Sequence, residues 1–409
     1  KAEGIAFEES RQFGVWRGRR VNRDRWAQAW DRMMAMPAQP TPPLLMWERS
    51  ESDSLPHAAE LGLADDGLQI APQAGRAEAL ATLHSFLHER GEHYTREMSS
   101  PLSGETACSR LSWHLAYGSL SMRETLQAAQ ARYRELPLSE KAWRQALRSF
   151  IARLHWHCHF IQKLESEPEA EYRPIARIYD GLRPRPADMA KLAAWSEGRT
   201  GYPFIDAAMR YLNATGWINF RMRAMLMSFS SYDLWLPWQE SGLALARKFI
   251  DYEPGIHWPQ CQMQAGETGI NTIRIYSPVK QGYDQDPQGL FIRRWVPELT
   301  HVPDGWLHEP WKLGEAERPQ LCADYPDRIV DHALAAKAAK EAIYALRRKP
   351  EARAEAKAVV QKHGSRKRTA DWKRKGAKAQ SDQAAKECSL NDACGKPWFR
   401  FCLRLRAFA

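Results

Sequence analysis

Apolar residues recur every three or four positions along most of the chain, which is the spacing of one face of an α-helix. Strand patterns are scarce, and neither βαβ alternation nor a G-x-G-x-x-G motif occurs. Asn22 is placed to cap the first helix, and Gly91 to end the second. The fold class is therefore predicted to be all-α. The predicted helices cover residues 22–36, 74–91, 139–165, 205–216, 219–238 and 240–252.

The stretch 199–223 places two glycine-containing turns around one helix. Residues 200–203 (T-G-Y-P) predict a turn, because glycine permits a positive φ and proline cannot continue a preceding helix. An apolar stripe follows and is broken at Gly216, before a second helix that carries Arg221 and Arg223. Residues two apart on a helix point to different faces. One arginine is therefore predicted to serve an interior ligand, and the other an outer anionic partner.

The positive charge of the chain is concentrated in its C-terminal part. The formal net charge is +10, while residues 337–378 hold 15 Lys/Arg and 4 Asp/Glu, a net +11. This run is helix-permissive up to His363 and is predicted to be mobile beyond it. Such a run attracts phosphate backbones without reading sequence, although a merely solvated basic helix is the equal alternative. The predicted organisation is a linker region with one helix over 1–75, a helical domain over 76–330 and a basic extension over 331–409.

Cysteine usage and hydropathy limit the setting of the protein. The seven cysteines form no C-x-x-C pair, which is typical of a reducing compartment. No apolar run approaches the length of a membrane span, so a cytoplasmic monomer with no membrane association is predicted. His155 and His159 share a helix face, which is one ligand spacing for zinc. Helix packing is the favoured interpretation of these histidines, and no metal is predicted.

Four motifs together resemble a known family. W-x-x-G-x-T-G-Y-P-x-x-D-A-x-M-R-x-L-x-x-T-G-W, from Trp195 to Trp217, is similar to the flavin-binding half of the photolyase/cryptochrome family. S-R-L-S at 109–112 and the segments 274–289 and 291–299 continue the similarity in order. The resemblance implies an all-helical domain that holds a U-shaped FAD, preceded by an α/β antenna domain. No antenna domain is found in this sequence, and its first residue is Lys rather than Met.

The resemblance also implies a set of FAD-binding residues. Segment 108–112 resembles the part that cradles the FAD pyrophosphate with backbone N–H groups and hydroxyls, although Cys108 stands where threonine is usual. Arg223 and Asp251 match an ion pair beside the flavin, where the cation offsets negative charge. The implied residues are Tyr94, Cys108, Ser109, Arg110, Leu111, Ser112, Arg153, Trp217, Arg223, Asp251, Glu253 and His257.

The electron-transfer residues implied by the resemblance are only partly present. His257 falls where the family usually has asparagine facing the flavin N5, and Cys261 replaces the tryptophan nearest the flavin. Trp238 retains the middle position, while the outer one aligns near Arg185. Photoreduction is therefore expected to use other aromatic residues. The candidates are Trp258, Trp235, Tyr252 and Tyr232, and Trp238, Trp258 and His257 are the predicted catalytic residues.

The DNA side departs from the family as well. Arg221 and Gln281 are kept, whereas Ser149 replaces a glutamate, Phe220 an asparagine and Met263 a tryptophan. An apolar pocket can still hold a flipped pyrimidine pair. UV-damaged DNA is therefore the predicted partner, contacted through Ser149, Phe220, Arg221, Met263 and Gln281.

The resemblance leaves more than one function open. The favoured hypothesis is light-dependent repair of cyclobutane pyrimidine dimers by reduced FAD. The histidines that members acting on (6-4) photoproducts use would fall at Phe220 and Ala224, which cannot supply a proton. The main alternative is a cryptochrome-like blue-light photoreceptor without repair activity. A flavin-free DNA-binding protein is a third hypothesis.

Overall fold

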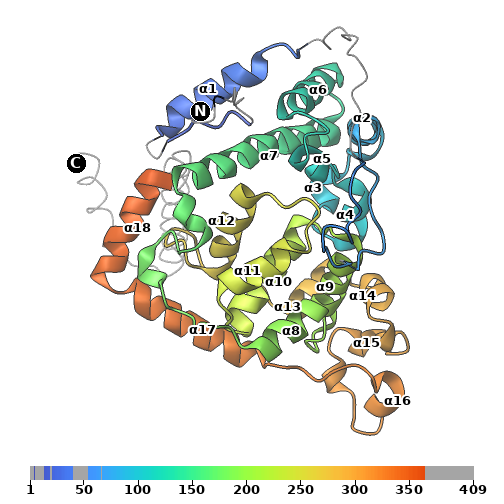
Figure 1. Cartoon of the computed structure of the whole chain (residues 1–409). Coiled ribbons are helices and arrows are strands. Elements are labelled where there is room, and N and C mark those ends of the chain that lie inside the picture. The colour runs from blue at the N-terminus through green and yellow to red at the C-terminus, as the bar shows by residue number, and fades with distance from the viewer. Residues whose placement is uncertain (1–3, 5–12, 19–20, 40–53, 66, 364–409) are drawn as a thin grey trace, which may run out of the picture. The chain divides into compact units, whose positions relative to one another are not determined.

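The computed structural model describes residues 4, 13–18, 21–39, 54–65 and 67–363, and these residues form helices and loops without a β-strand (Figure 1). The all-α prediction is confirmed for this part of the chain. The first α-helices are α1 (Arg23–Ala35), α2 (Arg76–Ser85), α3 (Tyr94–Glu97), α4 (Pro101–Ala107), α5 (Ser112–Ala116), α6 (Met122–Glu135), α7 (Lys141–Ser166) and α8 (Met189–Glu197). They are followed by α9 (Pro203–Thr215), α10 (Phe220–Ser228), α11 (Trp238–Ala246), α12 (Pro254–Ala265), α13 (Pro278–Gln285), α14 (Leu290–Trp295), α15 (Asp304–Leu307), α16 (Arg318–Cys322), α17 (His332–Arg347) and α18 (Pro350–His363).

Short helices of other types link these elements. The 3₁₀ turns are η2 (Pro168–Glu171), η3 (Arg177–Tyr179), η5 (Pro297–Leu299) and η6 (Pro310–Lys312), and the π-helical turns are η1 (Phe86–Arg90) and η4 (Phe229–Asp233). The chain divides into two compact units, Lys1–Ala356 and Lys357–Ala409. Of the second unit, only residues 357–363 are described.

Most helices begin and end where the sequence pattern predicts. The Asn22 side chain accepts hydrogen bonds from two backbone N–H groups at the start of α1. α2 and η1 together end before Gly91, and α17 and α18 continue to His363. The predicted mobility beyond His363 lies outside the described residues. The helix predicted over 219–238 differs, because α10 and η4 end at Asp233 and Trp235 adopts a left-handed φ of 58°.

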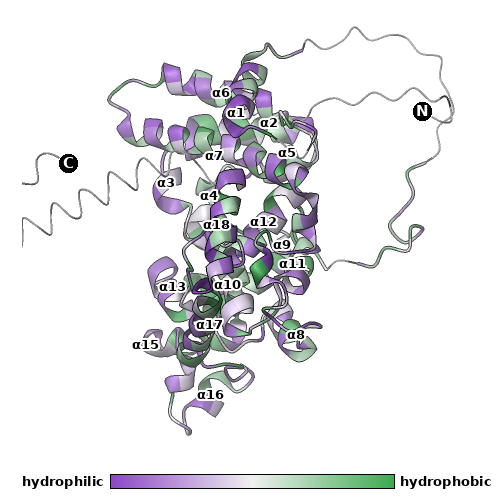
Figure 2. Cartoon of the chain, turned by 90° about the vertical axis from the view of Figure 1, so that its left-hand side faces the viewer, coloured by the Kyte–Doolittle hydropathy of each residue, from purple (hydrophilic) through white to green (hydrophobic). Residues whose placement is uncertain are grey.

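Two hydrophobic cores lie within the first unit. One gathers around α9, whose residues are nearly all buried, and it includes side chains from α10, α11, α12 and α14. The other lies between α1, α2, α6 and α7. Hydrophilic and hydrophobic residues alternate along α1, α6 and α7, as expected for helices with one buried face (Figure 2). Cys108 packs against both cores, so the segment that follows it lies where they meet.

A buried carboxylate fixes the turn before α9. Asp206 accepts hydrogen bonds from the Thr200 N–H at 2.8 Å, the Thr200 hydroxyl at 2.6 Å and the Gly201 N–H at 3.0 Å. The Tyr325 hydroxyl donates a fourth bond at 2.6 Å. Gly201 has a φ of 77°, and a Cβ at this position would lie 2.4 Å from the Asp327 carbonyl oxygen. The turn therefore needs glycine both for its backbone angle and for the close approach of the later segment.

α12 packs closely against α11 through a glycine and a histidine. A Cβ on Gly242 of α11 would lie 2.8 Å from the Trp258 ring, so the absent side chain lets the helices approach. His257 Nε2 lies 2.8 Å from the Gly242 carbonyl oxygen. Because a carbonyl only accepts, Nε2 carries the hydrogen and Nδ1 of the neutral ring is left as an acceptor. Burial lowers the pKa of His257 to about 4.

Among the described residues, no helix is both long enough and apolar enough to cross a membrane.

Replacing Asp206 by alanine is expected to destabilise the protein by roughly 3–5 kcal/mol, because it leaves several buried donors without an acceptor. The matched control is Asp188→Ala, which removes the exposed N-cap of α8. This control should cost only about 1 kcal/mol. Urea unfolding of both variants measures the difference. Equal losses would show that Asp206 acts as an ordinary helix cap.

His257 is expected to make stability depend on pH. Its pKa is about 4 in the folded protein against an ordinary value of 6.5, so the unfolded state binds a proton first as the pH falls. The stabilisation is complete above pH 6.5 and is lost progressively toward pH 4. Compared with His257→Asn, the wild type should lose about 3 kcal/mol more of its unfolding free energy over this window. Urea unfolding at a series of pH values measures this change. If the unfolding free energies of the two proteins fall equally between pH 6.5 and pH 4, the assignment is wrong.

Candidate functional site

An arginine that the sequence analysis did not single out organises segment 106–109. Arg90, at the end of η1, donates to the carbonyl oxygens of Thr106 and Ser109, each at 2.7 Å, and to that of Cys108. One guanidinium group therefore holds three carbonyls of a single loop. The next residue, Arg110, has a φ of 59°, which is uncommon for a residue with a side chain. Arg90 fixes the loop from which the predicted pyrophosphate segment starts.

Positive charge converges on this loop. Burial raises the pKa of the Cys108 thiol to about 11, and the charges of four nearby arginines oppose this shift. The four are Arg90, Arg110, Arg153 and Arg223. Among the described residues, Arg223 alone of these has a carboxylate in ion-pairing distance, at Asp251. The cluster carries a net positive charge in a partly buried place, which favours a bound anion.

Two polar groups at this loop have no hydrogen-bond partner in the part of the chain that the structure describes. They are Nη1 of Arg110 and the hydroxyl of Ser112, and both atoms are buried. The Arg110 guanidinium is held in place over the ring of Trp217, 3.8 Å from its centre, and 5.0 Å from that of Trp113. Buried donors of this kind are costly unless a partner satisfies them. The residues present therefore fit a phosphate-bearing cofactor such as FAD.

Tyr94 and Arg153 meet beside the same loop. Arg153 Nε donates to the Tyr94 hydroxyl at 2.6 Å, which joins α7 to α3. Asn219, which the sequence analysis also missed, donates to the carbonyl oxygens of Met98 and Ser99 at 3.0 and 2.9 Å. The side-chain oxygen Oδ1 of Asn219 is itself buried and has no hydrogen-bond partner among the described residues. This asparagine ties the start of α10 to the loop before α4.

The predicted ion pair between Arg223 and Asp251 is present. Arg223 Nη1 and Nη2 donate to the two carboxylate oxygens of Asp251 at 3.0 and 2.8 Å. Its Nε donates to the Ile218 carbonyl oxygen at 2.7 Å, and the guanidinium lies 4.2 Å from the centre of the Phe249 ring. The Asp251 side chain is only 2% exposed. The two-point geometry fixes both groups and keeps their charges balanced.

Glu253 is the N-cap of α12, and His257 lies on the first turn of this helix. Glu253 caps this helix by accepting from the Gly255 N–H at 3.1 Å, and burial raises its pKa. His257 packs against the rings of Tyr252 at 5.4 Å and Trp258 at 4.8 Å, measured between ring centres. The neutral imidazole described above therefore sits inside an aromatic cluster. In the described part of the chain, no hydrogen bond, ion pair or ring contact joins Glu253 or His257 to segment 108–112.

The aromatic residues predicted for electron transfer are in part neighbours. The rings of Trp238 and Trp258 meet edge to face at 6.0 Å. Cys261 is buried, with its sulfur 3.5 Å from His257 Nε2. Arg185 is exposed and pairs with Glu240 at 3.0 Å. A row of rings thus exists around Trp258, although Cys261 and Arg185 contribute no ring to it.

Among the predicted DNA-binding residues, one pair is in contact. Arg221 Nη1 donates to the Gln281 side-chain oxygen at 3.4 Å, which joins α10 to α13. Phe220, one residue earlier, is 57% exposed. Ser149 on α7 and Met263 on α12 are half-buried. The structure therefore brings Arg221 and Gln281 together and leaves Phe220 open to solvent beside them.

The histidines of α7 serve helix packing, as predicted. The His155 ring lies 5.4 Å from that of Trp26 and 4.8 Å from that of Trp30, both on α1. His159 packs on Trp26 at 5.8 Å. No group of three or more potential metal ligands is found in the described part of the chain.

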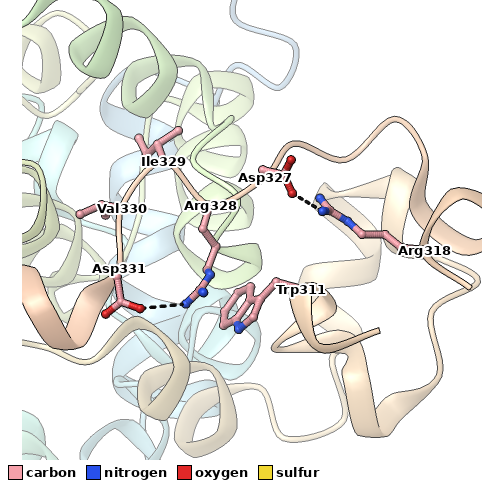
Figure 3. A pocket seen from close by; sticks show the side chains of 7 residues that line it. All are labelled: Trp311, Arg318, Asp327, Arg328, Ile329, Val330 and Asp331. Carbon is pink, nitrogen blue, oxygen red and sulfur yellow. Dashed lines mark hydrogen bonds and ion pairs between the residues drawn. The ribbon is translucent and has the colours of Figure 1, made fainter. Parts of the chain in front are cut away.

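A pocket of about 380 Å³ lies apart from these residues, on the segment that follows α16 (Figure 3). Arg318 faces Asp327, and Arg328 lies over the Trp311 ring, 4.4 Å from its centre, and toward Asp331. Both arginines are thus already paired with a carboxylate. The pocket contains none of the residues predicted from the sequence.

Comparisons with known proteins find relatives over much of the chain. Residues 150–345 match the family model described as the FAD binding domain of DNA photolyase. The chain is 32% identical over 324 residues to a deoxyribodipyrimidine photo-lyase of Halobacterium salinarum, covering 75% of this chain and 64% of that protein. It is 34% identical over 265 residues to the Escherichia coli photo-lyase, covering 62% and 52%. The chain thus spans between about half and two thirds of the length of these relatives.

Solved structures show the same similarity. The fold resembles a class III photolyase from Agrobacterium tumefaciens with a TM-score of 0.60 and 27% identity, covering 67% of this chain and 56% of that one. It resembles a Synechocystis cryptochrome with a TM-score of 0.63 and 25% identity, covering 71% and 61%. The helical fold, the cofactor-compatible arginine cluster and these similarities lead to one conclusion. Over residues 150–345 the chain matches the FAD binding domain of DNA photolyase, and in sequence and fold it is similar to photolyases and cryptochromes, which makes FAD its cofactor.

Proposed function

We propose that the protein repairs cyclobutane pyrimidine dimers in DNA, by light-driven electron transfer from reduced FAD. The observation that carries this proposal is the division of α10 between two tasks. Arg223 pairs with buried Asp251, whereas Arg221 and exposed Phe220 lie at the Gln281 contact. One short helix therefore borders both the cofactor site and a surface suited to DNA.

On the cofactor side, the arginine cluster binds and orients the pyrophosphate. Ser112 and Nη1 of Arg110 donate to phosphate oxygens, which supplies the partners that these buried groups lack. Arg153, fixed by the Tyr94 hydroxyl, adds positive charge. The Arg223–Asp251 pair is neutral, so it positions the cofactor without adding net charge. When bound and reduced, FAD supplies the electron that light makes available to the damaged bases.

On the DNA side, side chains of α10 and α13 act by contact rather than by acid–base chemistry. Arg221 pairs with a phosphate, and the exposed Phe220 ring offers an apolar face to an extrahelical base pair. Met263 on α12, which is half-buried, is the further apolar side chain that the resemblance assigns to this surface. Splitting a cyclobutane dimer needs an electron but no added proton. Phe220 and Ala224 carry no ionisable group, which favours this lesion over the (6-4) photoproduct.

A blue-light photoreceptor is the second candidate function. Relatives of this chain include a cryptochrome DASH of Gloeobacter violaceus, 29% identical and covering 71% of this chain and 59% of that protein. Ser149, in the position where the resemblance implies a glutamate contact to damaged bases, also favours it. Such a receptor would bind FAD in the same site but leave dimers intact.

The first prediction concerns FAD binding through Ser112. Because its buried hydroxyl has no hydrogen-bond partner among the residues that the structure describes, Ser112→Ala should leave the stability of the apoprotein unchanged. Loss of one hydrogen bond to FAD should weaken FAD binding by roughly tenfold. Fluorescence titration of the apoprotein with FAD measures the affinity, and urea unfolding measures the stability.

The matched control for Ser112 is Ser121→Ala. Ser121 caps α6 by accepting from the Glu124 N–H at 3.1 Å. Its replacement should lower stability by about 1 kcal/mol and leave FAD affinity unchanged. If Ser112→Ala destabilises the apoprotein instead, or keeps full FAD affinity, the pyrophosphate does not bind at this hydroxyl.

The repair prediction is tested with the reduced, FAD-loaded protein and dimer-containing oligothymidine. Illumination should restore the ultraviolet absorbance of thymine, because splitting the cyclobutane ring regenerates the 5,6 double bonds. Arg221→Ala should retain FAD and weaken binding to the damaged oligonucleotide, lowering the slope of log affinity against log salt by about one. Arg173→Ala, which removes an exposed arginine paired with Asp180, is the control that should change neither.

Two outcomes separate the candidate functions. Recovery of thymine absorbance in the light and not in the dark establishes repair. No recovery with fully reduced FAD present and the oligonucleotide bound excludes dimer repair and leaves the photoreceptor function. A protein that releases no flavin on denaturation excludes both.

A further inference from the structure

A buried hydrogen bond joins the indole of Trp238 to a carboxylate. Trp238 Nε1 donates to Glu267 Oε2 at 3.0 Å. Trp238 is completely buried, and Glu267 is 3% exposed. The carboxylate is therefore the acceptor in contact with this N–H, in a place that bulk water does not reach. The sequence analysis gave no role to Glu267.

Arg183 holds this carboxylate in place. Its Nη1 donates to Glu267 Oε1, so the two oxygens of the carboxylate serve two different partners. Nε and Nη2 of Arg183 donate to the carbonyl oxygens of Ser231 at 2.8 Å and Ala265 at 3.0 Å. The Arg183 and Glu267 side chains are 1% and 4% exposed. Every link in this network is made within the protein, which fixes Oε2 toward the indole.

The same guanidinium influences which ring can carry positive charge. Arg183 lies 4.6 Å from the centre of the Trp235 ring and 5.7 Å from that of Tyr232. A fixed cation at this distance opposes removal of an electron from either ring. Trp238 instead faces the negative carboxylate, which favours its oxidised form. The surroundings therefore select Trp238 over Trp235 and Tyr232 among the rings near Arg183.

Trp238 is also connected to the surface by a row of rings. It meets Trp258 at 6.0 Å, Trp258 meets His257 at 4.8 Å, and His257 meets Tyr252 at 5.4 Å between ring centres. Tyr252 is 37% exposed. Such a row can carry an electron to a buried oxidised ring, whereas the acceptor in contact with the Trp238 N–H is the Glu267 carboxylate.

We propose that Glu267 is the proton acceptor of Trp238 when this indole is oxidised. A one-electron oxidant takes one electron from Trp238, the Nε1–H bond breaks, and the proton forms an O–H bond at Oε2. The products are a neutral indolyl radical and a carboxylic acid, and return of one electron and this proton restores both groups. The oxidant is the light-excited, oxidised flavin, and in this one respect the inference rests on the proposed function.

Proton transfer changes how long the oxidised state persists. A charged indole recombines as soon as an electron returns, whereas the neutral radical must also recover its proton. The protonated Glu267 keeps that proton one hydrogen bond away from the indole. The radical state therefore persists, and the proton can still return to Trp238. Burial, which raises the pKa of Glu267, is consistent with this role, although Arg183 acts against it.

The experiment is transient absorption and light-minus-dark infrared spectroscopy of the FAD-loaded protein. The wild type should show the visible spectrum of the deprotonated tryptophan radical and the C=O band of a newly protonated carboxylic acid. Glu267→Gln should lose the band and show the protonated radical. Glu240→Gln is the control, because Glu240 lies on the same helix as Trp238 but pairs with exposed Arg185. This control should behave as the wild type.

A second variant keeps the test decisive if Glu267→Gln does not fold. Trp238→Phe leaves the Arg183–Glu267 pair intact and should abolish the carboxylic acid band. If the band persists in Trp238→Phe, or if the wild type forms only the protonated radical, Glu267 is not the acceptor. If the flavin-loaded wild type forms no tryptophan radical at all, the failure lies with Trp238 as electron donor and overturns the proposal at that earlier step.

Discussion

The carboxylate of Asp206 is the constraint on which the arrangement of the larger core depends. It satisfies donors of the turn before α9 and of Tyr325, which lies far later in the chain. These bonds set the direction of α9, whose residues are nearly all buried. α10 begins four residues after Gly216 closes α9, so its orientation follows from the same turn. The Arg223–Asp251 ion pair and the half-buried Arg221 of α10 are thus placed by a group that touches neither.

The arginine cluster around Cys108 differs from the larger core in its charge balance. The larger core is built from groups that satisfy one another, whereas this loop gathers four guanidinium groups with one carboxylate among the described residues. Folding such a site costs free energy, because like charges repel and buried donors lack partners. A bound anion removes both costs. The free energy that this site costs on folding is therefore recovered when the cofactor binds, and it contributes to the binding affinity.

The sequence allowed the helices and much of this site to be predicted, since their signals are local or occur in short motifs. Amphipathic spacing located α1, α7 and α9 closely, and the Arg223–Asp251 pair followed from the family resemblance. Arg90 and Asn219 were missed because their partners are backbone carbonyls, which no residue pattern reveals. The helix over 219–238 was overextended, because apolar periodicity continues past the left-handed Trp235.

The contact between Glu267 and Arg183 also could not be predicted from the sequence, because 84 positions separate the two residues in the chain. Each lies in a loop, and in the sequence neither differs from a charged residue at the surface. Only the fold shows that both are buried and that they meet Trp238. Similarity to family motifs therefore does not predict a buried ionic network of this kind.

The position of Cys108 has a consequence for cooperativity. Its side chain packs against both hydrophobic cores, and the arginines around it come from helices and loops of each. An anion bound there would lie beside both cores, so the free energy of its binding would oppose their separation. Occupancy of the site would therefore make the two cores unfold more cooperatively.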